Sequence, residues 1–188
     1  MSTFSRIAVV VVFLFSVGLL VSALPSPRAA DASWAIVGAD MFPVCTLLEK
    51  FFLEVKVCID AIAACHDLVT LKLKVAVFVA LCKGCAADLL KIGADVKITA
   101  EAQASIVNCF VSMLTLLVQV CVNLTAKFGV AVIATLCAEI DIVLKFLFVH
   151  LDICINGVLG LIAKACTGSV VDLLIQLKLK LCLSVLGL

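Results

Sequence analysis

Apolar side chains dominate the chain from residue 44 to residue 188, and the polar positions among them recur at helical spacing. Steps of three or four residues place polar side chains on one side of a helix. The longest such series is Glu101, Ser105, Asn108, Ser112, Thr115, Gln119 and Asn123. Since each turn then offers water about one side chain, a helix of this kind is buried on most sides. The pattern predicts an all-α fold.

We expect a compact bundle of about six helices arranged as antiparallel hairpins. No proline interrupts residues 44–188, and Gly93 and Gly168 are typical helix-stop signals. Thr99 is a candidate N-cap for the third helix. The predicted helices cover residues 43–68, 71–92, 99–122, 125–150, 152–166 and 169–186.

The cysteine spacing indicates an internal duplication. Cys109, Cys121 and Cys137 are 12 and 16 residues apart, and the same two intervals separate a second set of three cysteines, Cys154, Cys166 and Cys182. The offset between the two sets is 45 residues, which suits a repeat of two helices. With a weaker first copy, the predicted repeats cover about 44–98, 99–143 and 144–188.

The repeat also suggests which cysteines meet. Asn123 and Gly168 each lie 14 residues from a cysteine on either side, and both residue types adopt left-handed backbone at helix ends. If each is the apex of a hairpin, the flanking cysteines lie level and form disulfides. The predicted bridges are Cys109–Cys137, Cys154–Cys182 and, around Thr70, Cys58–Cys82, with Cys121 and Cys166 pairing with each other or with Cys65.

The N-terminal segment predicts export from the cell. Arg6 precedes an apolar run over residues 7–20, and small residues end at Ala23, as in a secretory signal peptide of residues 1–23. An uncleaved anchor helix is the alternative. Residues 24–43 hold all 3 prolines and are expected to be a flexible leader or pro-segment before a single domain, 44–188. The sequon at Asn123 is a candidate glycosylation site.

If the chain is exported, its 11 cysteines are in an oxidising compartment. In an oxidising compartment, disulfides are more frequent than metal sites or catalytic thiols. An odd number leaves at least one cysteine unpaired or bonded to another chain.

Composition favours self-association. Hydrophobic residues make up 65% of the chain and charged residues 14%, where soluble domains have about 25% charged residues. Removal of Arg6 with the signal leaves 13 basic and 13 acidic residues, so no net charge keeps copies apart. We therefore expect contact with other copies, with lipid or with an apolar surface. A nucleic-acid partner and a disordered chain are not expected.

No motif indicates catalysis or a cofactor. Cys82 and Cys85 form the one C-x-x-C, but no second pair completes a zinc ribbon and no strand precedes it as in thioredoxin-like proteins. His66 and His150 have no nucleophile motif beside them. We therefore predict a non-enzymatic protein with no catalytic, cofactor or metal site.

The sequence favours a secreted structural protein of the cell surface or cell wall that is surface-active or self-associating. The first alternative is a multi-pass membrane protein, because residues 102–126 carry no charge and are long enough to cross about 30 Å of hydrocarbon. Charges interrupt the other apolar runs, which argues against several spans. The second alternative is a carrier that holds a lipid between its helices.

Overall fold

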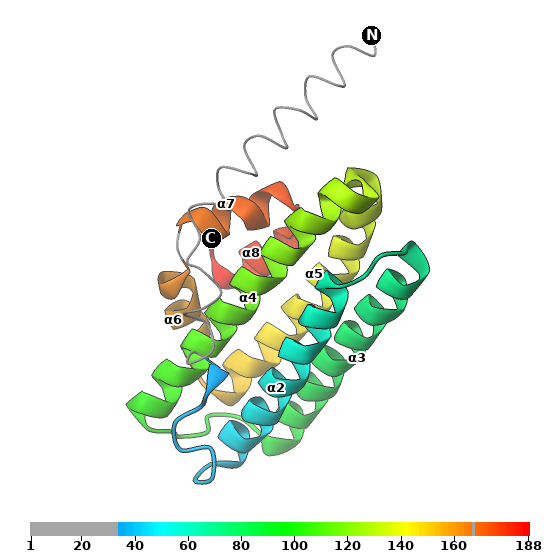
Figure 1. The fold of residues 1–188 in the computed structure, drawn as a ribbon. Helices are drawn as coiled ribbons and strands as arrows, with labels where there is room; N and C mark the ends of the chain where they lie inside the picture. Colours follow the sequence, from blue (N-terminus) through cyan, green and yellow to red (C-terminus); the bar gives the residue numbers. More distant parts are fainter. Residues whose placement is uncertain (1–33, 167) are drawn as a thin grey trace, which may run out of the picture.

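Seven helices and no strand make up the described part of the chain, residues 34–166 and 168–188 of a computed structural model (Figure 1). They are α2 (Pro43–Ala63), α3 (Leu68–Ile92), α4 (Ala100–Phe128), α5 (Val130–Cys154), α6 (Val158–Ala165), α7 (Gly168–Gln176) and α8 (Lys180–Leu186). The predicted all-α fold is confirmed. The predicted signal peptide, 1–23, and the leader up to residue 33 lie outside the described residues.

The four long helices form two antiparallel hairpins, α2–α3 and α4–α5 (Figure 1). Between the hairpins, α2 packs against α4 and α3 packs against α5. The backbone N–H groups of Asp95 and Val96 donate to the carbonyl oxygens of Ile153 and Cys154 at 3.1 and 2.8 Å. The C-terminal ends of α3 and α5 therefore meet at the same end of the bundle, and these two helices run parallel.

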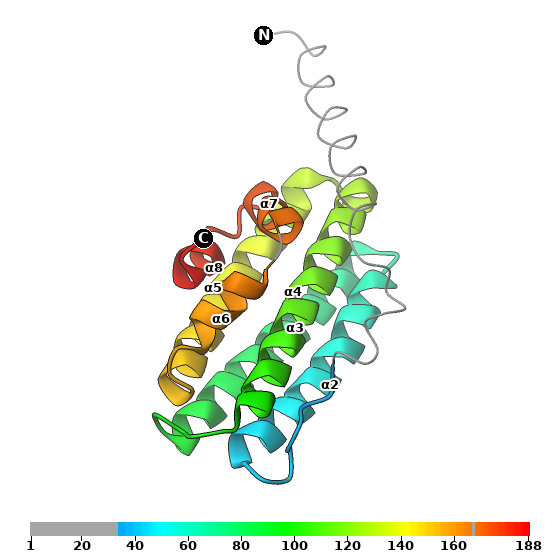
Figure 2. The same cartoon turned by 90° about the vertical axis from the view of Figure 1, so that its left-hand side faces the viewer.

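The three short helices cover one side of the bundle. Helices α6 and α7 pack on α4, and α8 packs on α5. The α2–α3 hairpin lies on the opposite side (Figures 1 and 2). Helix α4 is thus surrounded by neighbours, whereas no other described helix packs on the outer side of α3.

Local sequence determines where the long helices begin and end. Pro43 occupies the first turn of α2, where its missing N–H costs nothing. The Asp67 carboxylate accepts a hydrogen bond from the Thr70 N–H at 2.8 Å and caps α3. The Thr99 hydroxyl accepts from the Ala102 N–H at 3.2 Å, as predicted for the start of α4. Glycine at 93 and at 129, each with a positive φ, ends α3 and α4.

A chain of aromatic rings crosses the core. Ring centroids are 6.1 Å apart for Trp34 and Phe52, 4.8 Å for Phe52 and Phe110, and 5.7 Å for Phe110 and Phe148. These rings join α2, α4 and α5 by edge-on packing. Because Trp34 and Ile36 are both buried, the described end of the leader packs on the bundle.

Helix α8 is attached to α5 through a buried carboxylate. Asp141 of α5 is 5% exposed, and its two oxygens accept hydrogen bonds from the N–H groups of Leu181 and Cys182 at 2.9 and 2.7 Å. These groups belong to the first turn of α8 and have no partner within that helix. A side chain from a distant helix therefore caps α8.

The predicted turns differ from the observed ones at three places. Asn123, the predicted apex of a hairpin, lies inside α4, which continues to Phe128 and turns at Gly129. The predicted helix 169–186 is divided into α7 and α8, because Lys178 has a φ of 60°. The chain turns before Thr70, between α2 and the Asp67 cap of α3. Gly129 has a φ of 90° and a ψ of 152°, a combination that glycine alone adopts readily.

The predicted 45-residue repeat is not confirmed by the helix boundaries. Residues 145–173, which are 45 positions after α4, contain the end of α5, all of α6 and the start of α7. The predicted repeat would therefore make one continuous helix of 29 residues equivalent to parts of three different helices.

Candidate functional site

The outer side of α3 is apolar along most of its length. Val69, Leu73 and Val77 follow one another at steps of four and are 70, 63 and 50% exposed. The positions between and beyond them on this side hold small residues, namely Ala76, Ala80, Gly84 and Ala87, all exposed. Lys72 and Lys83 flank the stripe on the side towards α5, and Lys91 follows at the end of the helix. The apolar side chains on this side of α3 are therefore exposed to solvent along most of the helix.

Helix α5 adds a second exposed apolar stripe. Ile142, Phe146, Val149 and Ile153 recur at steps of four, three and four, and each is exposed. Hollows between the two helices show that they border each other at the surface. One, of about 340 Å³, is lined by Lys83 of α3 and by Ile142, Val143 and Phe146 of α5. We call the exposed side chains of both stripes the α3/α5 face: Val69, Leu73, Val77, Leu90, Ile142, Phe146, Val149 and Ile153.

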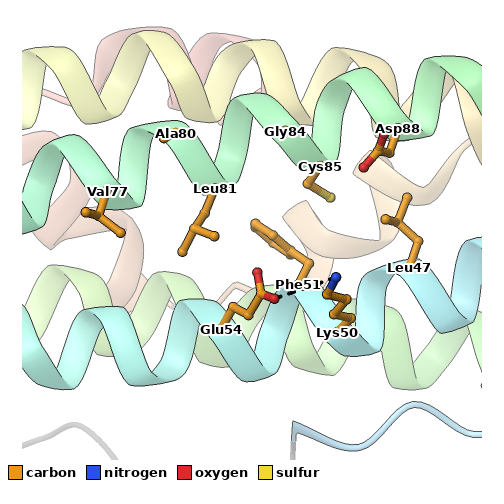
Figure 3. A pocket seen from close by; sticks show the side chains of 10 residues that line it. All are labelled: Leu47, Lys50, Phe51, Glu54, Val77, Ala80, Leu81, Gly84, Cys85 and Asp88. Carbon is orange, nitrogen blue, oxygen red and sulfur yellow. Dashed lines mark ion pairs between the residues drawn. The ribbon is translucent and has the colours of Figure 1, made fainter.

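A groove of about 340 Å³ separates α2 from α3 on the adjoining surface. Phe51 and Leu81 lie between the two helices, and the Lys50–Glu54 ion pair, 3.9 Å long, lies at the rim (Figure 3). Val77 belongs both to this groove and to the α3/α5 face. The apolar stripe of α3 thus adjoins the groove towards α2, and Lys83 lies between this stripe and that of α5.

The sulfur atoms of the 11 cysteines, all within the described residues, are joined by no disulfide. Cys109 lies 20 residues before the turn at Gly129, whereas Cys137 lies only 8 residues after it. At about 1.5 Å per residue, their positions along the helix axes differ by about 18 Å. The structure therefore does not bring the predicted Cys109–Cys137 pair together.

The predicted Cys154–Cys182 pair is not brought together either. Cys182 is anchored at Asp141, which lies 13 residues before Cys154 on α5, or about 20 Å along the helix. Cys182 has Cys166 as a thiol neighbour instead. Cys58 and Cys82, the third predicted pair, are neighbours in the α2–α3 interface without being bonded.

Cys121 contacts a cysteine that we did not assign to it. Its side chain shares a hydrogen bond with that of Cys137 across the α4–α5 hairpin. We expected Cys121 to pair with Cys166 or Cys65. The difference arises from the position of the turn, because Cys121 and Cys137 are each 8 residues from Gly129.

Burial suppresses the acidity of most thiols. It raises the pKa of Cys85, Cys109 and Cys182 from 9.0 to about 12, and that of Cys82 further still. Nearby acidic groups, Asp88 beside Cys85 and Asp141 beside Cys182, add to the effect. A protonated thiol is neither a good nucleophile nor a good metal ligand. The C-x-x-C pair, Cys82 and Cys85, therefore consists of two buried thiols that stay protonated.

Both histidines have local partners. The Nδ1 atom of His66 lies 2.9 Å from the Lys127 Nζ, and that Nζ also donates to the Cys65 carbonyl oxygen. The Nδ1 atom of His150 lies 2.8 Å from the Phe146 carbonyl oxygen, and its ring packs on the Phe146 ring. Within residues 34–166 and 168–188, no three metal-ligating side chains converge.

Asn123 is exposed on α4, so the sequon is at the surface. Of the described helices, α4 is the one that is by itself long and apolar enough to cross a membrane. However, 67% of the most apolar 18-residue stretch of α4 is buried inside the bundle. A buried core helix of a soluble protein has the same length and composition.

Comparisons with protein-family models, with curated proteins and with solved structures found no match for this chain. The candidate site therefore depends on geometry alone. The α3/α5 face was not predicted from the sequence, although Val69, Leu73 and Val77 recur at helical spacing. In a chain that is 65% hydrophobic, such a series is indistinguishable from a buried one until the neighbours of α3 are known.

Proposed function

We propose that this chain is an exported, non-enzymatic protein that acts at an apolar boundary, through the α3/α5 face. The boundary is an air–water or cell-wall surface, a lipid layer or the same face of another copy. The observation that carries the proposal is the pair of neighbouring stripes of exposed apolar side chains along α3 and α5, with Lys83 between them. Single exposed apolar residues are ordinary, but a contiguous patch is typical of an interaction surface.

The composition of the flanks supports this function. Helix α3 carries Lys72, Lys74, Lys83 and Lys91 with Asp88 as its one acidic residue. Lysine stems cover apolar surface while their ammonium groups stay in water, so a stripe between lysines suits an interface. Balanced total charge favours close approach of copies.

The experiment compares surface activity between matched substitutions. Ile142 on the α3/α5 face and Ile175 on α7 are 61 and 57% exposed, and the neighbours of Ile175 on the surface include Asp172 and Lys178. We expect protein recovered from the medium of an expressing host to lower the surface tension of water. Ile142→Glu should weaken that effect strongly, and Ile175→Glu should leave it nearly unchanged. Equal behaviour of both variants would contradict the proposal.

A lipid carrier is a second candidate, favoured by the groove between α2 and α3. The groove volume of about 340 Å³ falls at the lower end of small-ligand pockets, about 300–1,000 Å³. Organic extraction of the purified protein distinguishes the two functions. A stoichiometric lipid would favour the carrier, and lipid-free protein that still lowers surface tension would favour the interfacial function.

A further inference from the structure

The α4–α5 hairpin places two cysteines opposite each other. Gly129 forms the turn, with α4 ending at Phe128 and α5 beginning at Val130. Cys121 precedes Gly129 by 8 residues and Cys137 follows it by 8. Residues equally far from the turn of an antiparallel hairpin lie level with each other, that is, at the same position along the two helix axes. The fold alone therefore places Cys121 and Cys137 opposite each other.

Contact between the side chains is a second observation. The thiols of Cys121 and Cys137 share a hydrogen bond, and both residues are buried between the helices. A disulfide requires Cα atoms within about 7 Å of each other and side chains that face each other. Cysteines on neighbouring helices come close to this geometry only if they are level and in contact. The pairs predicted from spacing, Cys109–Cys137 and Cys154–Cys182, are not level.

We propose that Cys121 and Cys137 form a disulfide that joins α4 to α5 when the protein matures in an oxidising compartment. This inference shares with the proposed function the premise that the chain is exported, and it is independent of what the α3/α5 face binds. The oxidant is a disulfide, either a small molecule such as oxidised glutathione or a protein oxidoreductase.

The exchange proceeds in two steps. The Cys137 thiolate attacks one sulfur of the oxidant and releases the other as a thiolate, which leaves a mixed disulfide on Cys137. The Cys121 thiolate then attacks the Cys137 sulfur and releases the second half of the oxidant. Two protein thiols are oxidised, one oxidant disulfide is reduced to two thiols, and those thiols take up the two protons. Since both cysteines are buried, the exchange takes place while the hairpin is open.

Peptide mapping tests the pairing. The reduced chain is refolded in a glutathione buffer, blocked with N-ethylmaleimide and digested with trypsin without reduction. Trypsin yields peptide 98–127, which contains both Cys109 and Cys121, and peptide 128–145, which contains Cys137 alone. We expect these peptides to be linked, and fragmentation of the linked pair to place the bridge at Cys121. A bridge at Cys109, or recovery of Cys137 with maleimide attached, would overturn the inference.

Two alanine variants provide an independent readout. Cys109→Ala should keep the link between the two peptides, and Cys121→Ala should abolish it. Reductant should lower the melting temperature of the wild type and of Cys109→Ala by roughly 6–12 °C, as expected for a bridge across a short loop in a domain of this size. Reductant should leave the melting temperature of Cys121→Ala nearly unchanged. An equal fall in all three proteins would show that another bridge is responsible.

Discussion

The side chain of Asp141 attaches the short helix α8 to α5. Its carboxylate accepts the two N–H groups that begin α8. Asp141→Ala leaves both groups without an acceptor in a buried place. We expect a loss of about 2–4 kcal/mol in the free energy of unfolding, measured by urea titration.

Asp141→Asn and Glu139→Ala are the controls for that prediction. Asparagine keeps one carbonyl oxygen, so Asp141→Asn should lose less than Asp141→Ala. Glu139 is exposed on the same helix, and its removal should change stability by less than about 0.5 kcal/mol. If Asp141→Ala is as stable as Glu139→Ala, the carboxylate does not hold α8.

The buried thiols predict a pH dependence of stability in the reduced protein. Burial raises the pKa of Cys85 and Cys182 from 9.0 to about 12, so the folded state keeps protons that the unfolded chain releases above pH 9. Stability is therefore fully present below pH 9 and falls as the pH rises towards 12, by up to about 1.4 kcal/mol per pH unit and thiol. Urea unfolding in reductant at pH 7, 9 and 10 measures the fall. Cys182→Ala should reduce the slope by the share of one thiol, because Cys82, Cys85 and Cys109 still contribute, and an unchanged slope in that variant would contradict the assignment.

At the scale of helices, the hydrophobic pattern predicted the long elements better than the turns. The cap at Thr99 and the stop at Gly93 are confirmed, because each depends on residues adjacent in sequence. The turn at Gly129 was misplaced to Asn123. Both residue types suit helix ends, and only packing of α5 against α3 and α4 determines which one is used.

The polar series of α4 shows a second limit of sequence reasoning. We expected it to face water, yet Ser105 is buried and Ser112, Thr115 and Gln119 are partly buried. Serine and threonine hydroxyl groups can donate a hydrogen bond to a backbone carbonyl of their own helix and so do not need water as a partner. The Thr115 hydroxyl donates in this way to the Val111 carbonyl oxygen at 2.8 Å. A polar stripe of serine and threonine is therefore weaker evidence for exposure than one of charged residues.

Two glycines allow a matched test of the helix boundaries. Gly129→Ala forces a side chain into a backbone conformation with a φ of 90°, and should cost about 1–3 kcal/mol. Gly84→Ala lies inside α3, where nothing stands within 4 Å of the added carbon, and should stabilise by about 0.5–1 kcal/mol. Chemical denaturation of both variants measures the difference. Equal stabilities would contradict the turn at Gly129.

At the scale of the molecule, the bundle is covered unevenly. Helices α6–α8 cover α4 and α5 on one side, and no described helix covers the outer side of α3 on the other (Figure 1). The exposed apolar side chains of α3 and α5 therefore have no cover from the described part of the chain itself. The chain has 14 basic and 13 acidic residues, so its net charge of +1 gives little repulsion between copies.

Molar mass in detergent-free solution tests this account most directly. Sedimentation equilibrium of the purified protein should show assemblies of several copies or protein with bound lipid, since both would cover the apolar side chains of the α3/α5 face. A monomer without lipid, stable at high concentration, would show that the chain hides enough of its apolar surface alone, and would contradict the central claim.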